Sequence, residues 1–181
     1  MKKEVNKDKV LRLINAGNVI LVTSSYKGKD NIAACAWNTP CSHKPAALLI
    51  AFATSHFSSE LITKSAEFIV NVPDWSLKDK VIFCGTHSGR DCDKFQEAKL
   101  NREKPHTLTK TPKIKECIGS IECSLIDVKK IGDHFIFFGE PLYTEAEENL
   151  FDFKNCVWKD EAGLIFHLGG SCFAKQGATE K

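Results

Sequence analysis

The stretch "IGSIECSLIDVKKIGDHFIFFGEPLYTEAE", residues 118–147, decides the fold class. Apolar and polar side chains alternate through much of it, which is typical of half-buried strands. Gly132 and Asp133 interrupt the pattern at "KIGDH", and such a pair favours a tight turn. The stretch therefore predicts two long antiparallel strands joined at 132–133. Cys117 and Cys123 are separated by an even number of residues, which predicts that both lie on one face of the first strand.

Further strands are predicted on both sides of this hairpin. Residues 18–25 and 32–37 flank the turn signal "KGKDN" and predict a second hairpin. The continuous apolar run "PAALLIAFA", 45–53, predicts a strand buried on both faces. Strands are also predicted at 68–73 and at 163–173, the latter ending at a double glycine.

Short helices are predicted between these strands. Helical spacing appears at 10–14, with Gly17 as the stop signal, and again at Leu61 and Ile62. Residues 76–83 predict another helix, with Ser76 and Asp79 spaced as a capping box. About six or seven strands without βαβ alternation predict a mainly β protein, an antiparallel barrel with short peripheral helices.

Composition limits the class of protein. The 181 residues are expected to form one domain spanning 1–181, and an apolar share of 43% is enough for a core. A net charge of +2 gives no field that would attract nucleic acid. No apolar run is long enough to span a membrane, and the charged N-terminus does not resemble a signal peptide. These features predict a soluble, cytoplasmic protein with no nucleic-acid or membrane partner.

Eight cysteines raise the question of metal or disulfides. No C-x-x-C pair occurs, so the zinc-ribbon and thioredoxin signatures are absent and no metal site is predicted. Ordinary free thiols, several of them in the core, are the simpler interpretation, and they fit a reducing cytoplasm.

Common catalytic motifs are missing as well. The sequence has no G-x-G-x-x-G, no P-loop, no H-E-x-x-H and no G-x-S-x-G. The search therefore moves from hydrolytic machinery to a bound cofactor.

The polar stretch "SGRDCDKF", 88–95, has two interpretations. It can be a helix start capped by Ser88 or Asp91, with Asp93 at the positive end of the helix. That interpretation leaves Lys94 unexplained, because a lysine in the first turn opposes the helix dipole, whereas a bound phosphate would hold it there. Arg90 is expected to pair with Asp93, to assist the same site, or to be a plain surface residue.

The stretch "TSHFSSE", 54–60, has the same ambiguity. Its hydroxyls at Thr54, Ser55, Ser58 and Ser59 can be turn and cap residues. They also follow a buried strand and open a helix, which is a good position for an anion cradle.

Two more stretches could contact a flat ligand. In "NIAACAWNTPCS", 31–42, small residues allow close approach, Trp37 offers a stacking face, and Asn31 and Asn38 offer amides; a hairpin with an interface tryptophan is the alternative. His134 in "GDHF" is either a ligand or a solvated loop histidine.

The motifs, taken together, resemble the flavin reductase family and specifically its flavoredoxin-like branch. The resemblance covers about residues 17–173. It rests on N-x-A-x-x-A-W-N-x-P at 31–40, T-S-x-x-S-x-x-L-I at 54–62, F-I-V-N-V-P at 68–73, S-G-R-D-x-D-K-F at 88–95, E-C-I-G-S-I-E-C at 116–123 and G-D-H-x-I-F-x-G-E at 132–140.

The resemblance implies an FMN-binding split β-barrel that forms a homodimer, with the flavin near the subunit interface. Asn31 and Trp37 would contact the isoalloxazine, and the loop Ala34, Cys35, Ala36, Trp37, Asn38, Thr39 would offer backbone groups to the ring edge. Thr54, Ser55 and Ser58 would bind the ribityl-phosphate end, with Lys94 on the phosphate and Ser88 and Arg90 nearby. His134 and Phe166 would complete the pocket, one or both from the partner subunit.

The implied function is an FMN-dependent oxidoreductase. It would pass reducing equivalents from NAD(P)H through FMN to a flavin, ferric or protein acceptor, with Trp37 and His134 as the positioning residues of the catalytic site. One alternative is a flavoredoxin-type electron carrier that is reduced by another redox protein and does not use NAD(P)H. A third interpretation, based on the cysteine count, is a cofactor-free dimeric or metal-binding module.

Overall fold

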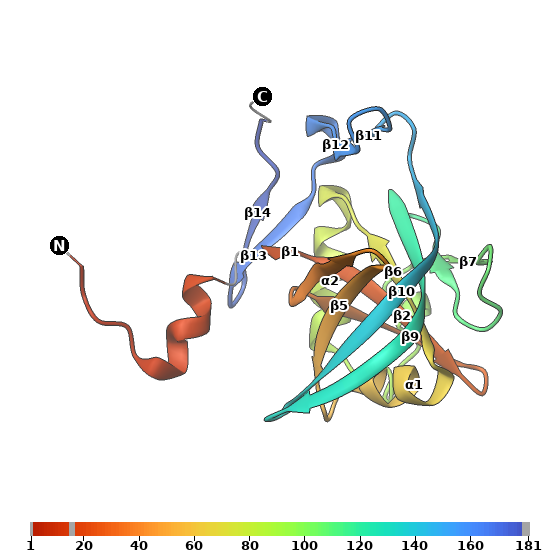
Figure 1. The fold of residues 1–181 in the computed structure, drawn as a ribbon, viewed down its shortest axis with the longest axis horizontal. Coiled ribbons are helices and arrows are strands. Elements are labelled where there is room, and N and C mark those ends of the chain that lie inside the picture. Colours follow the sequence, from red (N-terminus) through yellow and green to blue (C-terminus); the bar gives the residue numbers. More distant parts are fainter. Residues whose placement is uncertain (1, 15–16, 179–181) are drawn as a thin grey trace.

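The computed structural model describes residues 2–14 and 17–178, and its largest element is a seven-stranded antiparallel sheet (Figure 1). The strand order is β3-β2-β6-β9-β10-β5-β4. The strands are β2 (Ile20–Tyr26), β3 (Lys29–Cys35), β4 (Asn38–His43), β5 (Ala46–Ala53), β6 (Glu67–Val72), β9 (Gly119–Ile131) and β10 (His134–Ala146). The mainly antiparallel β architecture expected from the sequence is confirmed.

The long β9–β10 hairpin lies where the sequence predicts it. Its strands are paired from His134 opposite Ile131 to Ala146 opposite Gly119, and Gly132 has a φ of 58° in the turn. Two irregularities, after Phe138 and after Pro141, interrupt the register. Such bulges increase the local twist, which helps a sheet to curl.

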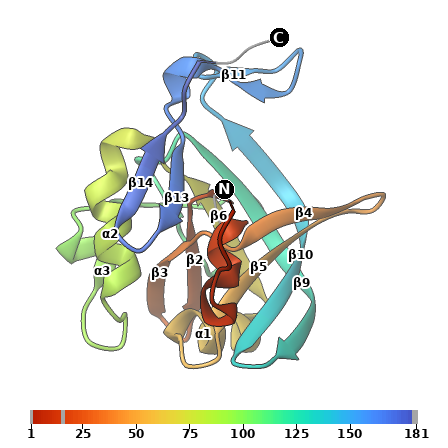
Figure 2. The same cartoon turned by 90° about the vertical axis from the view of Figure 1, so that its left-hand side faces the viewer.

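The sheet curls until its two ends meet. Just beyond β3, the carbonyl oxygen of Trp37 accepts a hydrogen bond from the backbone N–H of Ala51 in β5, at 2.9 Å. Apolar side chains fill the interior, among them the fully buried Ile50, Phe68 and Phe137. The result is the expected barrel, from which the β4–β5 hairpin projects (Figure 2).

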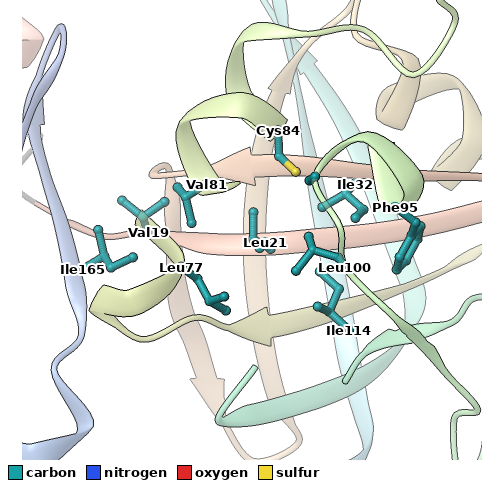
Figure 3. Close-up of a cluster of buried hydrophobic side chains, with 11 residues drawn as sticks. Val19, Leu21, Ile32, Leu77, Val81, Cys84, Phe95, Leu100, Ile114 and Ile165 are labelled. Carbon is teal, nitrogen blue, oxygen red and sulfur yellow. The ribbon is translucent and has the colours of Figure 1, made fainter. Parts of the chain in front are cut away.

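Short helices cover the outside of the barrel. They are α1 (Phe57–Ser65), α2 (Lys78–Thr86), α3 (Lys94–Glu97) and the 3-10 turn η2 (Trp75–Leu77). Two further 3-10 turns are η1 (Lys7–Leu13), which stands away from the barrel (Figure 1), and η3 (Asp160–Ala162) near the C-terminus. Figure 3 shows a second buried cluster, in which Val81 and Cys84 of α2 face Leu21 and Ile32 of the sheet. This packing fixes the end of α2 over β3.

Three small sheets complete the described residues. A three-stranded sheet contains β1 (Gly17–Asn18), β13 (Ile165–Gly169) and β14 (Cys172–Lys175). The two others pair β7 (Arg102–Glu103) with β8 (Lys113–Ile114) and β11 (Phe151–Asp152) with β12 (Val157–Trp158). The β13–β14 hairpin runs beside α2 (Figure 2), because Ile165 and Phe173 pack on the cluster below that helix.

The loop between α3 and β9 is held by buried carboxylates. Glu122, which is fully buried, accepts hydrogen bonds from the backbone N–H groups of His106, Thr107 and Leu108 at 2.6, 2.8 and 2.9 Å. Glu67 accepts two more from Thr111. These bonds tie a segment without a long helix or strand of its own to β6 and β9.

Several local expectations are wrong, for identifiable reasons. The first helix is a 3-10 turn, Gly17 begins a strand, and the predicted end of the helix at 15–16 lies outside the described residues. The Ser76 and Asp79 capping box does not form, because the carboxylate of Asp74 accepts the hydrogen bonds from Ser76 at the start of η2.

Two burial predictions also fail. In β5, Ile50 and Phe52 are buried inside the barrel, whereas the alternate side chains are only partly covered, so the strand is not buried on both faces. Cys117 precedes β9 and packs on the cluster below α2, whereas Cys123 belongs to the barrel interior. An even spacing predicts a common face only within one continuous strand.

Candidate functional site

Two adjoining pockets lie where α1, α2 and the loop before α3 meet β3. The first, here called the lysine pocket, has a volume of about 280 Å³. Its lining residues are Asn31, Ala33, Ala34, Ser55, His56, Phe57, Ser58, Cys84, Gly85, Thr86, His87, Ser88, Gly89, Arg90 and Lys94.

The second, here called the tryptophan pocket, has a volume of about 350 Å³. Its lining residues are Leu11, Arg12, Ala34, Cys35, Ala36, Trp37, Ala51, Phe52, Ala53, His56, His134 and His167. Ala34 and His56 line both pockets, so the two pockets adjoin and can be considered one candidate site.

Lys94 is the buried cation of the lysine pocket. The side chain of Asp93 caps α3 by accepting hydrogen bonds from the backbone N–H groups of Phe95 and Gln96, and this fixes Lys94 as the first helical residue. Lys94 is only 4% exposed, and its Nζ donates to the carbonyl oxygens of Ile32 and Cys84, both at 2.8 Å. An ammonium has three donors, so one remains for a ligand. Burial lowers the pKa of Lys94, and a bound anion would offset that cost.

Asn31 and Ser58 form the floor of the lysine pocket. The Asn31 amide Nδ2 donates to Ser58 Oγ at 2.7 Å, and both residues are buried. Asn31 Oδ1 has no hydrogen-bond partner among the described residues, although it is buried. An unsatisfied acceptor of this kind is costly, which makes it a common mark of a binding site.

Arg90 lies at the rim of the lysine pocket. Its guanidinium donates to the carbonyl oxygen of Ser55 and to Glu60, both at 3.0 Å, and lies over the ring of Phe57. It does not pair with Asp93, whose carboxylate is taken by Arg102. Arg90 therefore ties the loop before α3 to the start of α1.

The electrostatic field of the site is positive. His56, at the junction of the two pockets, has its pKa lowered by partial burial and then by the charges of His134, Lys94 and Arg90. The first turn of α1, which no side chain caps at His56, adds the positive end of a helix dipole at the same place. A cluster of cations with a helix N-terminus favours an anionic ligand.

The tryptophan pocket offers a flat surface. Trp37 is 38% exposed, and its ring stacks on His134 with centroids 4.8 Å apart and planes inclined by 28°. His134 Nδ1 lies 2.7 Å from Asp133 Oδ1, and this contact lowers the pKa of Asp133. The thiol of Cys35 donates to the Trp37 carbonyl at 3.3 Å, so β3 and β5 together fix the backbone beside the indole.

The structure brings most of the sequence-predicted site residues to these pockets. The lysine pocket contains Asn31, Ala34, Ser55, Ser58, Ser88, Arg90 and Lys94, and the tryptophan pocket contains Ala34, Cys35, Ala36, Trp37 and His134. Asn31 lines the lysine pocket and Trp37 the tryptophan pocket, whereas the resemblance implies that both contact the isoalloxazine. Ser88 does not cap α3; its hydroxyl accepts a hydrogen bond from the backbone N–H of Arg90.

Four predicted residues lie outside both pockets. The backbone N–H of Thr54 donates to Asp133, and the amide of Asn38 donates to the carbonyls of Asn18 and Cys35. Thr39 donates to the carbonyl of Pro40, which follows it. Phe166 packs against a third apolar cluster around Leu164, and its neighbour His167 lines the tryptophan pocket in its place.

Several pocket residues were missed from the sequence. His56 stands inside the quoted stretch 54–60 and His87 directly before 88–95, so their positions were a usable signal. The sequence gives no signal for Arg12 and His167. They reach the tryptophan pocket because β1 pairs with β13, which brings residues from both ends of the chain to this side of the barrel.

Other kinds of site find no support in the part of the chain that is described. No three His, Cys, Asp or Glu side chains there gather in a way that could hold a metal ion. All eight cysteines are free. Within residues 2–14 and 17–178, no helix has the length and apolar character needed to cross a membrane.

Comparison with known sequences gives a family. The model of the flavin reductase like domain matches residues 12–166. An uncharacterized protein of Pyrococcus abyssi is 34% identical over 138 residues, which is 76% of this chain and 78% of the relative. Two further archaeal relatives, from Aeropyrum pernix and Archaeoglobus fulgidus, are matched over only 53% and 64% of their own lengths.

Solved structures have the same fold. An FMN-binding protein from Thermus thermophilus is 26% identical with a TM-score of 0.80, over 91% of this chain and 88% of that one. Flavoredoxin from Methanosarcina acetivorans is 22% identical with a TM-score of 0.88, over 100% of this chain and 94% of the other. With its barrel, its joined pockets and a family match over most of its length, the chain belongs to the flavin reductase-like family.

Proposed function

We propose that this protein binds FMN, with the phosphate in the lysine pocket and the isoalloxazine in the tryptophan pocket. The observation that carries the proposal is Lys94, a lysine that is 4% exposed and has one donor left beside the first turn of α1. A phosphate accepts hydrogen bonds from both kinds of donor.

The remaining residues fit the rest of the cofactor. Ser58 Oγ accepts a hydrogen bond from Asn31, so its own hydroxyl hydrogen can be donated to a ribityl oxygen. Ala34, shared by both pockets, has a side chain small enough for a chain of atoms to pass over it. The stacked rings of Trp37 and His134 give the flat isoalloxazine an aromatic wall.

We infer an oxidoreductase that takes reducing equivalents from NAD(P)H and delivers them to a flavin, ferric or protein acceptor. Bound FMN supplies the electron-transfer chemistry, so the protein needs to bind, orient and shield it. Lys94 and the start of α1 hold the anionic end, and Trp37 and His134 position the ring. The family description supports this class of reaction, and the flavoredoxin likeness supports a carrier without NAD(P)H activity as the second candidate.

We further propose that the protein is a homodimer. Val10, Leu11, Leu13 and Ile14 near the N-terminus are 48, 52, 67 and 83% exposed, an unusual amount of apolar surface for a free segment. This segment stands away from the barrel (Figure 1), and Leu11 also borders the tryptophan pocket. A second copy could cover these side chains beside the site. Light scattering coupled to size-exclusion chromatography would give twice the chain mass if this is right, and the chain mass if it is wrong.

Eight free thiols support a reducing, cytoplasmic location.

The visible absorption spectrum of the purified protein tests the function. Flavin bands that bleach on anaerobic addition of NADH or NADPH would support the reductase and identify its donor. Bands that persist with both nucleotides but bleach with a reduced ferredoxin would support the electron carrier. No bands after FMN has been added would overturn the proposal.

A further inference from the structure

A third pocket, largely apolar, opens beside the two that make up the site. It has a volume of about 370 Å³ and is lined by Val19, Ala34, Ala36, Val81, Ile82, Gly85, Thr86, His167, Gly170, Ser171 and Phe173. No Asp, Glu, Lys or Arg is among these residues. We refer to it as the apolar pocket.

The apolar pocket adjoins both parts of the proposed flavin site. It shares Gly85 and Thr86 with the lysine pocket, and Ala36 and His167 with the tryptophan pocket. Ala34 lines all three pockets. A molecule in the apolar pocket would therefore lie beside the path from the phosphate to the ring.

The walls of the apolar pocket are well supported. Val19 and Val81 are buried in the cluster below α2, where Figure 3 shows them next to each other. The opposite wall is the β13–β14 hairpin, in which the rings of His167 and Phe173 lie 5.1 Å apart. Ile82 of α2 is 36% exposed at the opening. The shape is thus set by packed elements, and it does not depend on a single flexible side chain.

We propose that the apolar pocket binds the flat ring of a neutral electron acceptor of the quinone class. The inference rests on the proposed function, because the flavin must supply the electrons. A quinone would take two electrons and one proton from the two-electron-reduced flavin as a hydride and a second proton from water, and it would leave as the hydroquinone while the flavin is returned to its oxidised state. The absence of charged lining residues disfavours ferric complexes and the phosphates of a nucleotide here, whereas an uncharged aromatic ring gains from leaving water.

A binding experiment without any electron donor tests this assignment. Menadione is titrated into the oxidised, FMN-loaded protein by isothermal calorimetry, and FMN affinity is measured separately on the apoprotein. The test variant is Ile82→Trp, which fills the mouth of the pocket without adding charge. The control is Ile126→Trp in β9, where the isoleucine is 54% exposed and lines none of the pockets described.

We expect Ile82→Trp to raise the Kd of menadione at least tenfold and to leave the Kd of FMN within about twofold, whereas Ile126→Trp changes neither. Reoxidation of the reduced protein by menadione should slow in Ile82→Trp, and reoxidation by ferricyanide should not.

Each other result overturns the assignment. If Ile82→Trp raised the Kd of FMN and of menadione equally, the pocket would be part of the binding site of the flavin ring. A changed subunit mass in Ile82→Trp would make it a contact between copies. A wild-type protein that binds FMN but not menadione would overturn this inference alone, and one that binds no FMN would overturn the proposed function with it.

Discussion

The side-chain oxygen of Asn31 lies directly against the backbone of Gly89. A Cβ atom at position 89 would approach Asn31 Oδ1 to 2.1 Å and its Cγ to 2.8 Å, so no side chain fits there. Gly89 therefore permits the position in which Asn31 donates to Ser58 at the floor of the lysine pocket.

Gly89→Ala should displace Asn31. We expect the free energy of unfolding to fall by about 1–3 kcal/mol, the usual cost of overpacking, and FMN binding to weaken. Urea denaturation and flavin titration measure the two effects. Gly177→Ala is the matched control, because a Cβ there meets nothing within 4 Å. Adding Asn31→Ala to Gly89→Ala should recover most of the stability; if it does not, the contact is not the cause.

Lys94→Met should distinguish the contribution of the phosphate to FMN binding from that of the rest of the flavin. Methionine keeps most of the buried side-chain volume but removes the charge, so FMN binding should weaken by about 1.5–3 kcal/mol. Riboflavin, which has no phosphate, should bind with unchanged affinity. Fluorescence titration measures both, and the control is Lys64→Met, at an exposed lysine of α1. An equal loss for riboflavin and FMN would mean that Lys94 acts only through its bonds to Ile32 and Cys84.

Lys113 and Glu145 form an ion pair that should control stability at low pH. Lys113 is 4% exposed and is bound to Glu145, with Glu103 at 3.3 Å. Although burial opposes it, the bond to Lys113 lowers the pKa of Glu145 below 4.5. The pair's stabilisation is therefore fully present above pH 4.5 and is lost as the pH falls through the lowered pKa.

Glu145→Gln should reduce the free energy of unfolding at neutral pH by about 1–2 kcal/mol. This is less than the roughly 3–5 kcal/mol of a fully buried pair, because Glu103 still faces Lys113. Denaturation curves across the acid range should show the difference from wild type shrinking below pH 4.5. Glu140→Gln, exposed on the same strand, is the control. A difference that stays constant down to pH 3 would contradict the ion-pair explanation.

The cysteines should divide into two groups by reactivity. Burial raises the pKa of Cys35 and Cys123 to about 12, so at pH 8 they hold almost no thiolate. Cys41, Cys156 and Cys172 are exposed. Iodoacetamide followed by peptide mass spectrometry should label those three within minutes and leave the buried pair unlabelled until denaturant is added. Early labelling of Cys35 would show that the barrel interior opens under native conditions.

The sequence predicted the barrel well where side chains alternate or a turn is unambiguous. The β9–β10 hairpin is an example, because the turn at Gly132 and the paired apolar runs are both local signals. Lys94 is also predicted as a site residue from a local signal, because a lysine in the first turn of a helix opposes the helix dipole unless an anion is bound there. Both inferences use neighbours in the chain.

What the sequence did not predict depends on contacts between distant residues. Asp93 pairs with Arg102 and not with Arg90, because Arg102 also binds Asp30, 72 residues away in the sequence, and is held between the two carboxylates. His167 reaches the tryptophan pocket, and Phe166 does not, because adjacent residues of a strand point to opposite sides. An error of one residue in such an assignment therefore places the predicted side chain on the wrong face of the strand.

The manner in which the loop before β9 is held has a consequence for how this protein can change. The carboxylates of Glu67 and Glu122 accept hydrogen bonds mainly from backbone N–H groups of the loop. Of these donors, only Thr111 also donates through its side chain. A peptide N–H is the same whatever residue carries it, proline excepted. The anchors therefore reside in the barrel. The exposed side chains of Lys104, Thr107, Thr109 and Lys110 can be exchanged, whereas Leu108 is buried and His106 stacks on Tyr143. Mutation could change the exposed side chains of this loop to bind a new partner, and a binding sequence could be grafted there, without any change to the barrel residues that hold the loop.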